Sequence, residues 1–313
     1  MSVFLTGPTA YDFWFRDNCI RRLDTPRLAN CHQAYQATAT ASARAIPWNE
    51  LASLNIEPKR SQPIHVAVPE ARKLIQSARV TSHVRRPETS GGFIRLTPNV
   101  YIESPAATAI RSSSDVAQAT LNLNRCLACF QLHNGAIEPA RPLTTRHELE
   151  STLEQIAGAH GTNASRTALQ YALENAASPR ECAVAALLVL PMRLGGQELP
   201  KPQLNAPVTV YQNEKELQRY IDFYWESHRV ALEYDGIEYH ALPTKMGQDS
   251  ARRAMLMSMG INVITLTSYQ LENRELFREA MIAIRRMLGA RSPSRTPYFT
   301  ERESALRERI VQL

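Results

Sequence analysis

Apolar and polar side chains alternate most regularly between residues 219 and 240, which have the sequence RYIDFYWESHRVALEYDGIEYH. Strict alternation over four to eight residues, with aromatic and β-branched side chains, is typical of a half-buried β-strand. The alternation runs to Trp225, breaks at the polar residues 226–228 and resumes at Val230. This stretch therefore predicts two strands joined as a hairpin.

Folding the hairpin about Ser227 brings acidic side chains of its two strands together. Asp222 is then opposite Glu233 or one position from it, Asp235 follows on the same face, and His240 comes shortly afterwards. Neighbouring carboxylates repel each other, and a divalent cation such as Mg²⁺ relieves the repulsion by binding carboxylate and water oxygens. The alternative is a solvated sheet face on which these carboxylates pair with neighbouring arginines.

The sequence around the hairpin predicts further regular elements. Ser178-Pro179 is typical of a helix start, and the apolar run that follows to Pro191 predicts a buried helix. The remaining elements are a strand at 206–212, a helix at 249–260, a buried strand at 262–267 and an amphipathic helix at 270–288. This order of helix, three strands, helix, strand and helix predicts an α/β domain with a mixed sheet flanked by helices.

The first half of the chain predicts a mixed α+β region. Strands are expected at 64–69, 78–84 and 93–102, and Ser104-Pro105 is typical of another helix start. Helices are expected at 10–23, 28–45, 114–133, 146–160 and 163–177. The segment 134–145 is rich in turn formers and predicts a domain boundary. The predicted parts are an N-terminal region at 1–145, a helical connector at 146–177, a C-terminal domain at 178–290, and a linker with a short helix at 291–313.

Composition argues against a disordered chain and against a membrane protein. Hydrophobic residues make up 44% and charged residues 21% of the 313 residues, which is typical of a globular chain with a sizeable core. The net charge of +6 permits a nucleic-acid partner. No long apolar run or signal-peptide pattern is present, so no membrane association is expected. Five cysteines without a disulfide-framework spacing predict a reducing, cytoplasmic location.

One pair of cysteines has the spacing of a partial zinc or redox motif. Cys126 and Cys129 form a C-x-x-C, with His133 four residues further on. No second pair of cysteines follows, and Leu123, Cys126, Phe130 and His133 have helical spacing. The pattern favours a helix that packs these side chains in a core.

The acidic residues of the hairpin resemble the signature of the restriction-endonuclease-like fold, an Asp followed ten or more residues later by Asp/Glu-x-Lys. Ten residues separate Asp222 from Glu233 here. Over roughly 178–270 the chain resembles the Vsr-like (very-short-patch-repair) endonuclease family more specifically. The matching segments are SPRE, LGGQELPKPQLN, IDFYWESHRVALEYDGIEYH and the D-x-x-R at Asp249–Arg252. The N-terminal region is similar, more loosely, to AbiEi-type antitoxin-like regions through IHVAVP, VTSHV and VYIESPAATAI.

The resemblance implies roles for five acidic and histidine residues. Asp222 and Glu233 would bind the metal, with Glu233 as second ligand or as a residue that positions water. His240 would act on the attacking water or the leaving group, and Glu181 would reach a metal-bound water. Asp235 occupies the place of the usual lysine, and its carboxylate could contribute to the same site. Glu181 has an alternative role in stabilising a helix N-terminus, and the alternative for His240 is an ordinary core or surface histidine.

The resemblance also implies nucleic-acid contacts by basic residues on the next helix. Arg252 would contact a phosphate or brace a carboxylate, and Arg253 and Lys245 would contact nucleic acid as well. The alternative is that Arg252 pairs only with Asp249 or Glu233.

The leading hypothesis is a metal-dependent endonuclease that hydrolyses phosphodiester bonds in DNA. Its cofactor would be Mg²⁺, with Mn²⁺ able to take its place, and the N-terminal region would bind DNA or a partner protein. The alternative is a catalytically inactive regulator, antitoxin-like or DNA-binding, that uses the nuclease fold as a scaffold. An RNA-cutting toxin is a third, weaker hypothesis.

Overall fold

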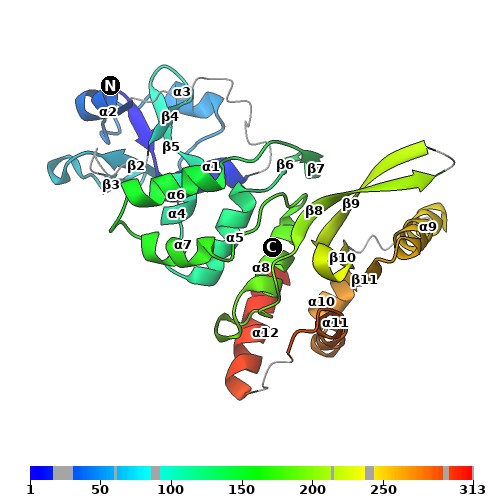
Figure 1. The fold of residues 1–313 in the computed structure, drawn as a ribbon. Coiled ribbons are helices and arrows are strands. Elements are labelled where there is room, and N and C mark those ends of the chain that lie inside the picture. Colours follow the sequence, from blue (N-terminus) through cyan, green and yellow to red (C-terminus); the bar gives the residue numbers. More distant parts are fainter. Residues whose placement is uncertain are drawn as a thin grey trace. The chain divides into compact units, whose positions relative to one another are not determined.

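A computed structural model shows how these elements are arranged (Figure 1). It describes residues 1–16, 31–59, 62–85, 92–212, 215–236, 243–291 and 296–311. The chain divides into two compact units, Met1–Gln170 and Tyr171–Leu313. Most of the helical segment predicted as a connector at 146–177 therefore lies in the first unit.

The first unit is built on a mixed sheet with the strand order β3-β2-β1-β5-β4. The strands are β1 (Val3–Leu5), β2 (Ile64–Val68), β3 (Val80–Val84), β4 (Phe93–Arg95) and β5 (Val100–Glu103). The predictions at 64–69, 78–84 and 93–102 are confirmed. Strand β1 was not predicted, because three residues are too short to show an alternation, and as the central strand it is buried on both faces.

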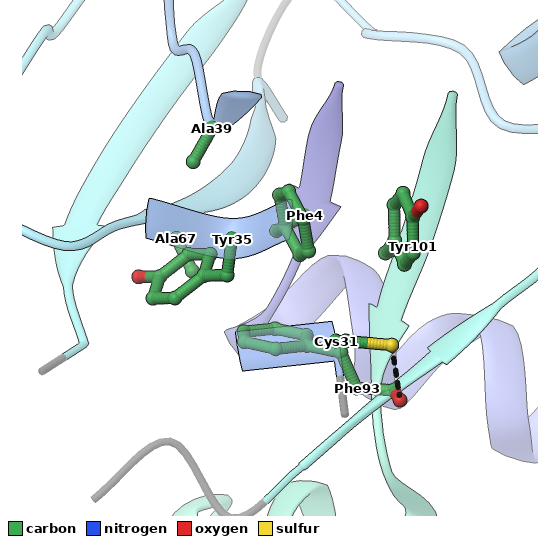
Figure 2. Packing of buried hydrophobic residues seen from close by; sticks show 7 residues of the cluster. All are labelled: Phe4, Cys31, Tyr35, Ala39, Ala67, Phe93 and Tyr101. Carbon is green, nitrogen blue, oxygen red and sulfur yellow. Dashed lines mark hydrogen bonds between the residues drawn. The ribbon is translucent and has the colours of Figure 1, made fainter. Parts of the chain in front are cut away.

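Phe4 of β1 is the centre of the aromatic core of this unit (Figure 2). Its ring stacks on Tyr101 at 4.5 Å and meets the edges of Tyr35 and Phe93 at 4.8 and 5.0 Å, measured between ring centroids. Phe4 and Tyr101 are paired residues of the parallel strands β1 and β5. The core therefore joins the chain start to strands and a helix far along the sequence.

The helices of the first unit are shorter than the sequence predicts. They are α1 (Gly7–Phe15), α2 (Cys31–Thr38), α3 (Trp48–Ser53), α4 (Pro105–Arg111), α5 (Val116–Cys126), α6 (Arg146–Gln155) and α7 (Thr162–Leu169), with a 3-10 turn at Ala71–Lys73. Ser104 caps α4 as predicted, because its side chain accepts a hydrogen bond from the Ala107 amide. The predicted helix at 10–23 begins earlier, and its part from 17 lies outside the described residues.

The predicted helix at 114–133 is wrong in its second half. Helix α5 ends at Cys126, and β6 (Phe130–His133) pairs with β7 (Ala136–Pro139) as a hairpin. Asn134 and Gly135 form its turn, with positive φ values of 50° and 76°, which is the conformation that a two-residue hairpin turn requires. Leu123, Cys126 and Phe130 are buried, as the packing interpretation predicted, whereas His133 is exposed on the hairpin.

The second unit contains the predicted order of elements. These are α8 (Pro179–Val189), β8 (Gln203–Gln212), β9 (Lys215–Trp225), β10 (Val230–Asp235), α9 (Pro243–Ser258), β11 (Asn262–Thr267), α10 (Ser268–Glu272), α11 (Arg274–Met287) and α12 (Pro297–Val311), with 3-10 turns at Met192–Leu194 and Glu226–His228. The sheet has the order β11-β10-β9-β8, with β10 and β11 parallel and the other pairs antiparallel.

Two boundaries in this unit differ from the prediction. The helix expected at 270–288 is divided at Asn273, whose side chain accepts hydrogen bonds from the amides of Glu275 and Leu276, both at 3.1 Å, and so starts α11. Helix α9 starts at Pro243 instead of residue 249. Helix α8 is buried through Val189, as its apolar run predicted.

The loop between α8 and β8 requires its two glycines. A Cβ atom on Gly196 would collide with the Leu190 carbonyl, and one on Gly195 would collide with the Arg302 carbonyl. Gly195 also has a φ of 87°, which disfavours other residues. These glycines let the loop return closely along α8 and α12 before β8 begins.

Within the described residues, no helix combines the length and apolar character needed to cross a membrane.

Substituting Phe4→Ala should lower the free energy of unfolding of the first unit by about 3–5 kcal/mol, the usual cost of removing a buried aromatic ring. Chemical denaturation followed by fluorescence and circular dichroism would measure it. Leu74→Ala is the control, because Leu74 is 49% exposed. A similar small loss for both variants would contradict the central role of Phe4.

Candidate active site

The register of β9 and β10 aligns the two acidic residues of the hairpin. The last pair of this antiparallel ladder is Phe223 with Leu232, so Asp222 and Glu233 occupy the next opposed positions. Opposed residues of antiparallel strands project to the same face. The alignment expected from folding the hairpin about Ser227 is therefore confirmed.

Asp222 is held by a backbone group of the neighbouring strand. The Tyr234 amide donates a hydrogen bond to Asp222 Oδ2 at 2.8 Å, so the carboxylate replaces a backbone acceptor where the ladder ends. Burial raises the pKa of Asp222, and the Tyr234 hydrogen bond and the positive charge of Arg252 only partly oppose this. The carboxylate is therefore well oriented and poorly solvated.

Glu233 is in direct contact with Arg252 of α9. One terminal nitrogen of Arg252 is 3.0 Å from Glu233 Oε2 and 3.2 Å from Oε1, and it also donates to the Tyr220 carbonyl. Burial and then the negative charge of Asp222 raise the pKa of Glu233 to about 8, against the opposing charge of Arg252. Of the roles expected for Arg252, bracing a carboxylate is the one that these contacts show.

Glu181 has a capping role and also belongs electrostatically to the acidic site. Its carboxylate accepts hydrogen bonds from the Ala177 amide at 2.7 Å and the Ser178 hydroxyl at 2.8 Å, at the start of α8. Burial raises its pKa to about 7, and the charge of Asp222 adds to this rise. The charge of Glu181 in turn raises the pKa of Glu233. The two roles considered from the sequence are therefore compatible.

A pocket of about 180 Å³ opens beside Glu233. Its walls come from β10, α9 and β11, namely Glu233, Tyr234, Asp235, Arg252, Arg253, Leu256, Val263 and Thr265. Asp235 is exposed at the end of β10, and Arg253 donates to the Thr265 hydroxyl at 2.7 Å. The pocket thus combines two carboxylates with two guanidinium groups.

Two of the predicted site residues cannot be placed in this geometry. His240 lies outside the described residues. Lys245 and Asp249 are residues of helix α9, but their side chains are outside the described part of the structure.

The sequence reasoning missed one neighbour of Asp222 on the other adjacent strand. Leu204 pairs with Phe223 and Ala206 with Ile221, so Asn205 falls opposite Asp222. Asn205 has a positive φ of 49°, a conformation that asparagine tolerates better than most residues. Only the strand register reveals this position, because Asn205 lies in a loop-like stretch of sequence.

The carboxylates of this site suit a hard cation that takes only a few of its ligands from the protein. Among the described residues, no group of three or more His, Cys, Asp or Glu side chains is arranged to hold a metal ion. Asp222 and Glu233 nevertheless offer carboxylate oxygens on facing strands, and Mg²⁺ is often bound by one or two carboxylates with water and substrate oxygens. Their poor solvation would be relieved by a cation.

The chain is similar to known proteins over part of its length. No family model matches the chain, and no solved structure gives a significant match. Two uncharacterised proteins of Mycobacterium tuberculosis, from two strains, are each 31% identical to this chain over 121 residues. The match covers 39% of this chain and 41% of the length of each relative.

The raised pKa of Glu181 predicts a stability that falls with rising pH in the metal-free protein. A carboxyl group with a pKa of about 7 in the folded state and an ordinary value near 4.5 when unfolded favours the folded state only while it is protonated. The loss begins above the unfolded pKa and is complete above about pH 7, with a size of up to about 3 kcal/mol.

Glu181→Gln should therefore be more stable than the wild type at about pH 8 and should lose part of the pH dependence. Thermal melting from about pH 5 to pH 8 with a chelator present would measure this. The exposed Glu279→Gln is the matched control. Identical pH profiles for wild type and Glu181→Gln would show that Glu181 is not destabilised by burial.

Proposed function

We propose that this chain is a metal-dependent endonuclease that hydrolyses phosphodiester bonds in DNA. The observation that carries the proposal is the pair of poorly solvated carboxylates, Asp222 and Glu233, facing each other on adjacent strands beside an open pocket. A sheet with only a structural role gains nothing from two neighbouring carboxylates, because their negative charges repel each other.

The arrangement of elements in the second unit supports the proposal. Helix α8, strands β8 to β10, helix α9, strand β11 and helix α11 follow the order expected for a restriction-endonuclease-like domain. Strand β11 lies parallel to β10 after the α9 crossover, so the sheet is mixed. Asp222 and Glu233 lie just beyond the last pair of the β9–β10 ladder.

Asp222 and Glu233 would hold the Mg²⁺ or Mn²⁺ ion. When bound, the ion would supply an activated water and neutralise charge developing on the phosphate. The Tyr234 amide orients Asp222, and Arg252 orients Glu233 through its hydrogen bonds. Arg252 would shift between bracing this carboxylate and contacting a phosphate, with Arg253 and Lys245 as further contacts on α9.

The chain must move a proton without the lysine that the signature usually contains. Asp235 stands at that position and is exposed at the pocket. Glu181 has a pKa of about 7, which suits a group that accepts a proton near neutral pH. We assign proton acceptance from the attacking water to Glu181, together with His240 as the resemblance implies.

The charge distribution supports a contact between the first unit and nucleic acid. The unit Met1–Gln170 contains 18 basic and 13 acidic residues, whereas Tyr171–Leu313 contains 18 and 17. Most of the net charge of +6 therefore belongs to the first unit. Positive charge of this kind attracts phosphate backbones, so this unit would bind DNA or a partner protein.

A second function keeps the same fold without catalysis. Asp235 in place of lysine and the engagement of Glu233 by Arg252 favour an inactive nuclease-fold regulator, antitoxin-like or DNA-binding. Such a chain would bind DNA or protein without a metal ion and would cleave nothing.

Asp222→Asn should lower cleavage of DNA by roughly 100-fold or more, because it removes a metal-binding charge. The asparagine oxygen can still accept the Tyr234 hydrogen bond, so folding should be retained. Supercoiled plasmid and single-stranded DNA would be incubated with Mg²⁺ or Mn²⁺, with chelator and RNA substrate as further arms. Glu226→Gln is the control, because Glu226 is exposed in the turn of the same hairpin.

Nicking that disappears in Asp222→Asn and persists in Glu226→Gln would support the nuclease. Cleavage retained by Asp222→Asn would overturn the site. Absence of cleavage by the wild type, together with no heat of metal binding, would favour the regulator.

A further inference from the structure

A second cavity of the unit Tyr171–Leu313 is lined by its last two helices, α11 and α12, which are labelled in Figure 1. It has a volume of about 200 Å³, and Gln197 of the loop after α8 completes the lining. The cavity shares no lining residue with the pocket beside Glu233. Its chemistry is therefore separate from that of the acidic site.

Apolar side chains form much of the wall of this cavity. Phe277 and Met281 of α11 are 1% and 3% exposed, and the partly buried Ile282 and Phe299 line the same space. A cavity of about 150 Å³ with apolar walls can hold benzene. The volume here therefore suits a six-membered ring or a short alkyl chain that carries a polar group.

Arg285 places a buried positive charge in the wall. Its side chain is 3% exposed, and its terminal nitrogens donate to the carbonyl oxygens of Arg291, at 2.7 Å, and of Gln197. Both acceptors are neutral, and the buried Nε atom has no hydrogen-bond partner among the described residues. Burial lowers the pKa of Arg285, and the charge of the exposed Glu198 only partly opposes this. The guanidinium is therefore held in place without a paired carboxylate.

The carboxylates of the lining are engaged by other arginines. Glu275 is 3.1 Å from Arg278, and Glu303 is 3.6 Å from Arg307, which does not line the cavity. Burial raises the pKa of Glu303, and the charges of Arg307 and then Arg274 oppose the rise. Arg274 lines the cavity at the start of α11 and forms no ion pair with a carboxylate of the described residues. Positive charge on the lining is therefore left without a partner.

We propose that this cavity binds a small organic acid, with its apolar body between α11 and α12 and its carboxylate beside Arg274 and Arg285. The lining contains three arginines and two glutamates, a net charge of +1, which one carboxylate balances. Guanidinium groups bind carboxylates through charge-assisted hydrogen bonds. Small-molecule sites commonly combine a mostly apolar wall with a few such polar groups. The inference does not depend on the proposed nuclease function.

Titration of the full chain with phenylacetate, followed by NMR of the ligand, tests this inference. Phenylacetamide has nearly the same shape without the charge, and its Kd should be about 10-fold higher or more, because hydrogen bonds to a charged group are the stronger ones. Acetate has the charge without the ring and should bind about 10-fold more weakly or less, because it buries little apolar surface.

Two variants locate the binding, and each has a matched control on the same helix. Arg274→Gln should raise the Kd for phenylacetate about 3- to 5-fold, the range of an exposed ion pair. Arg286→Gln removes an exposed arginine of α11 that does not line the cavity, and should change Kd less than about 2-fold.

The second variant fills the cavity from α12. Thr300→Trp places a large side chain at a lining position and should raise the Kd for phenylacetate about 10-fold or more, because protein interiors have little free space. Ala305→Trp adds the same ring at an exposed position of α12 outside the lining and should leave Kd unchanged. Circular dichroism would compare the folding of all four variants.

Saturable binding of phenylacetate that weakens in Arg274→Gln and Thr300→Trp, but not in their controls, supports the proposal. Equal affinity for phenylacetate and phenylacetamide would overturn it, because the arginines would then have no part in binding. Absence of phenylacetate binding by the wild type would also overturn it, as would equal effects of Arg274→Gln and Arg286→Gln. If Thr300→Trp does not fold, the comparison of the two arginine variants decides.

Discussion

The second unit is organised by the electrostatic cost of placing Asp222 beside Glu233. Two carboxylates on adjacent strands repel each other, and burial deprives both of water. The protein limits this cost with one backbone amide, from Tyr234, and one guanidinium, from Arg252. These contacts orient the carboxylates but leave the pKa of each raised, so the site remains short of positive charge. A bound cation would relieve this deficit.

Several structural contacts in the unit also serve this site. Glu181 completes the start of α8 through Ala177 and Ser178, and the same side chain contributes negative charge near Asp222. Arg252 joins α9 to both β9 and β10. Because structural and electrostatic contacts coincide, changes at these residues must be compared with matched variants that separate folding from function.

Local pattern predicted the elements whose signal lies within a few residues. The alternation around Asp222 and Glu233 gave the hairpin, and Ser178-Pro179 gave the start of α8, because strand period and helix caps are local properties. The helix assigned to 114–133 failed, because helical spacing of Cys126 and Phe130 outweighed the Asn134-Gly135 turn signal. Strand β1 was missed, since its burial depends on partners far along the chain.

The sequence by itself determined the order of elements in the second unit and a hairpin that brings Asp222 opposite Glu233 or one position from it, because alternation and turn position restrict the register of a hairpin. The strand pairing of the structure then decided for the opposed arrangement. Only the tertiary structure decided which basic side chain contacts Glu233. It also decided that Glu181 lies close enough to Asp222 for their charges to interact, and that Asn205 falls opposite Asp222. These relations join α8, β8 and α9 to the hairpin. Burial and pKa arise from that packing, and no spacing within one segment encodes them.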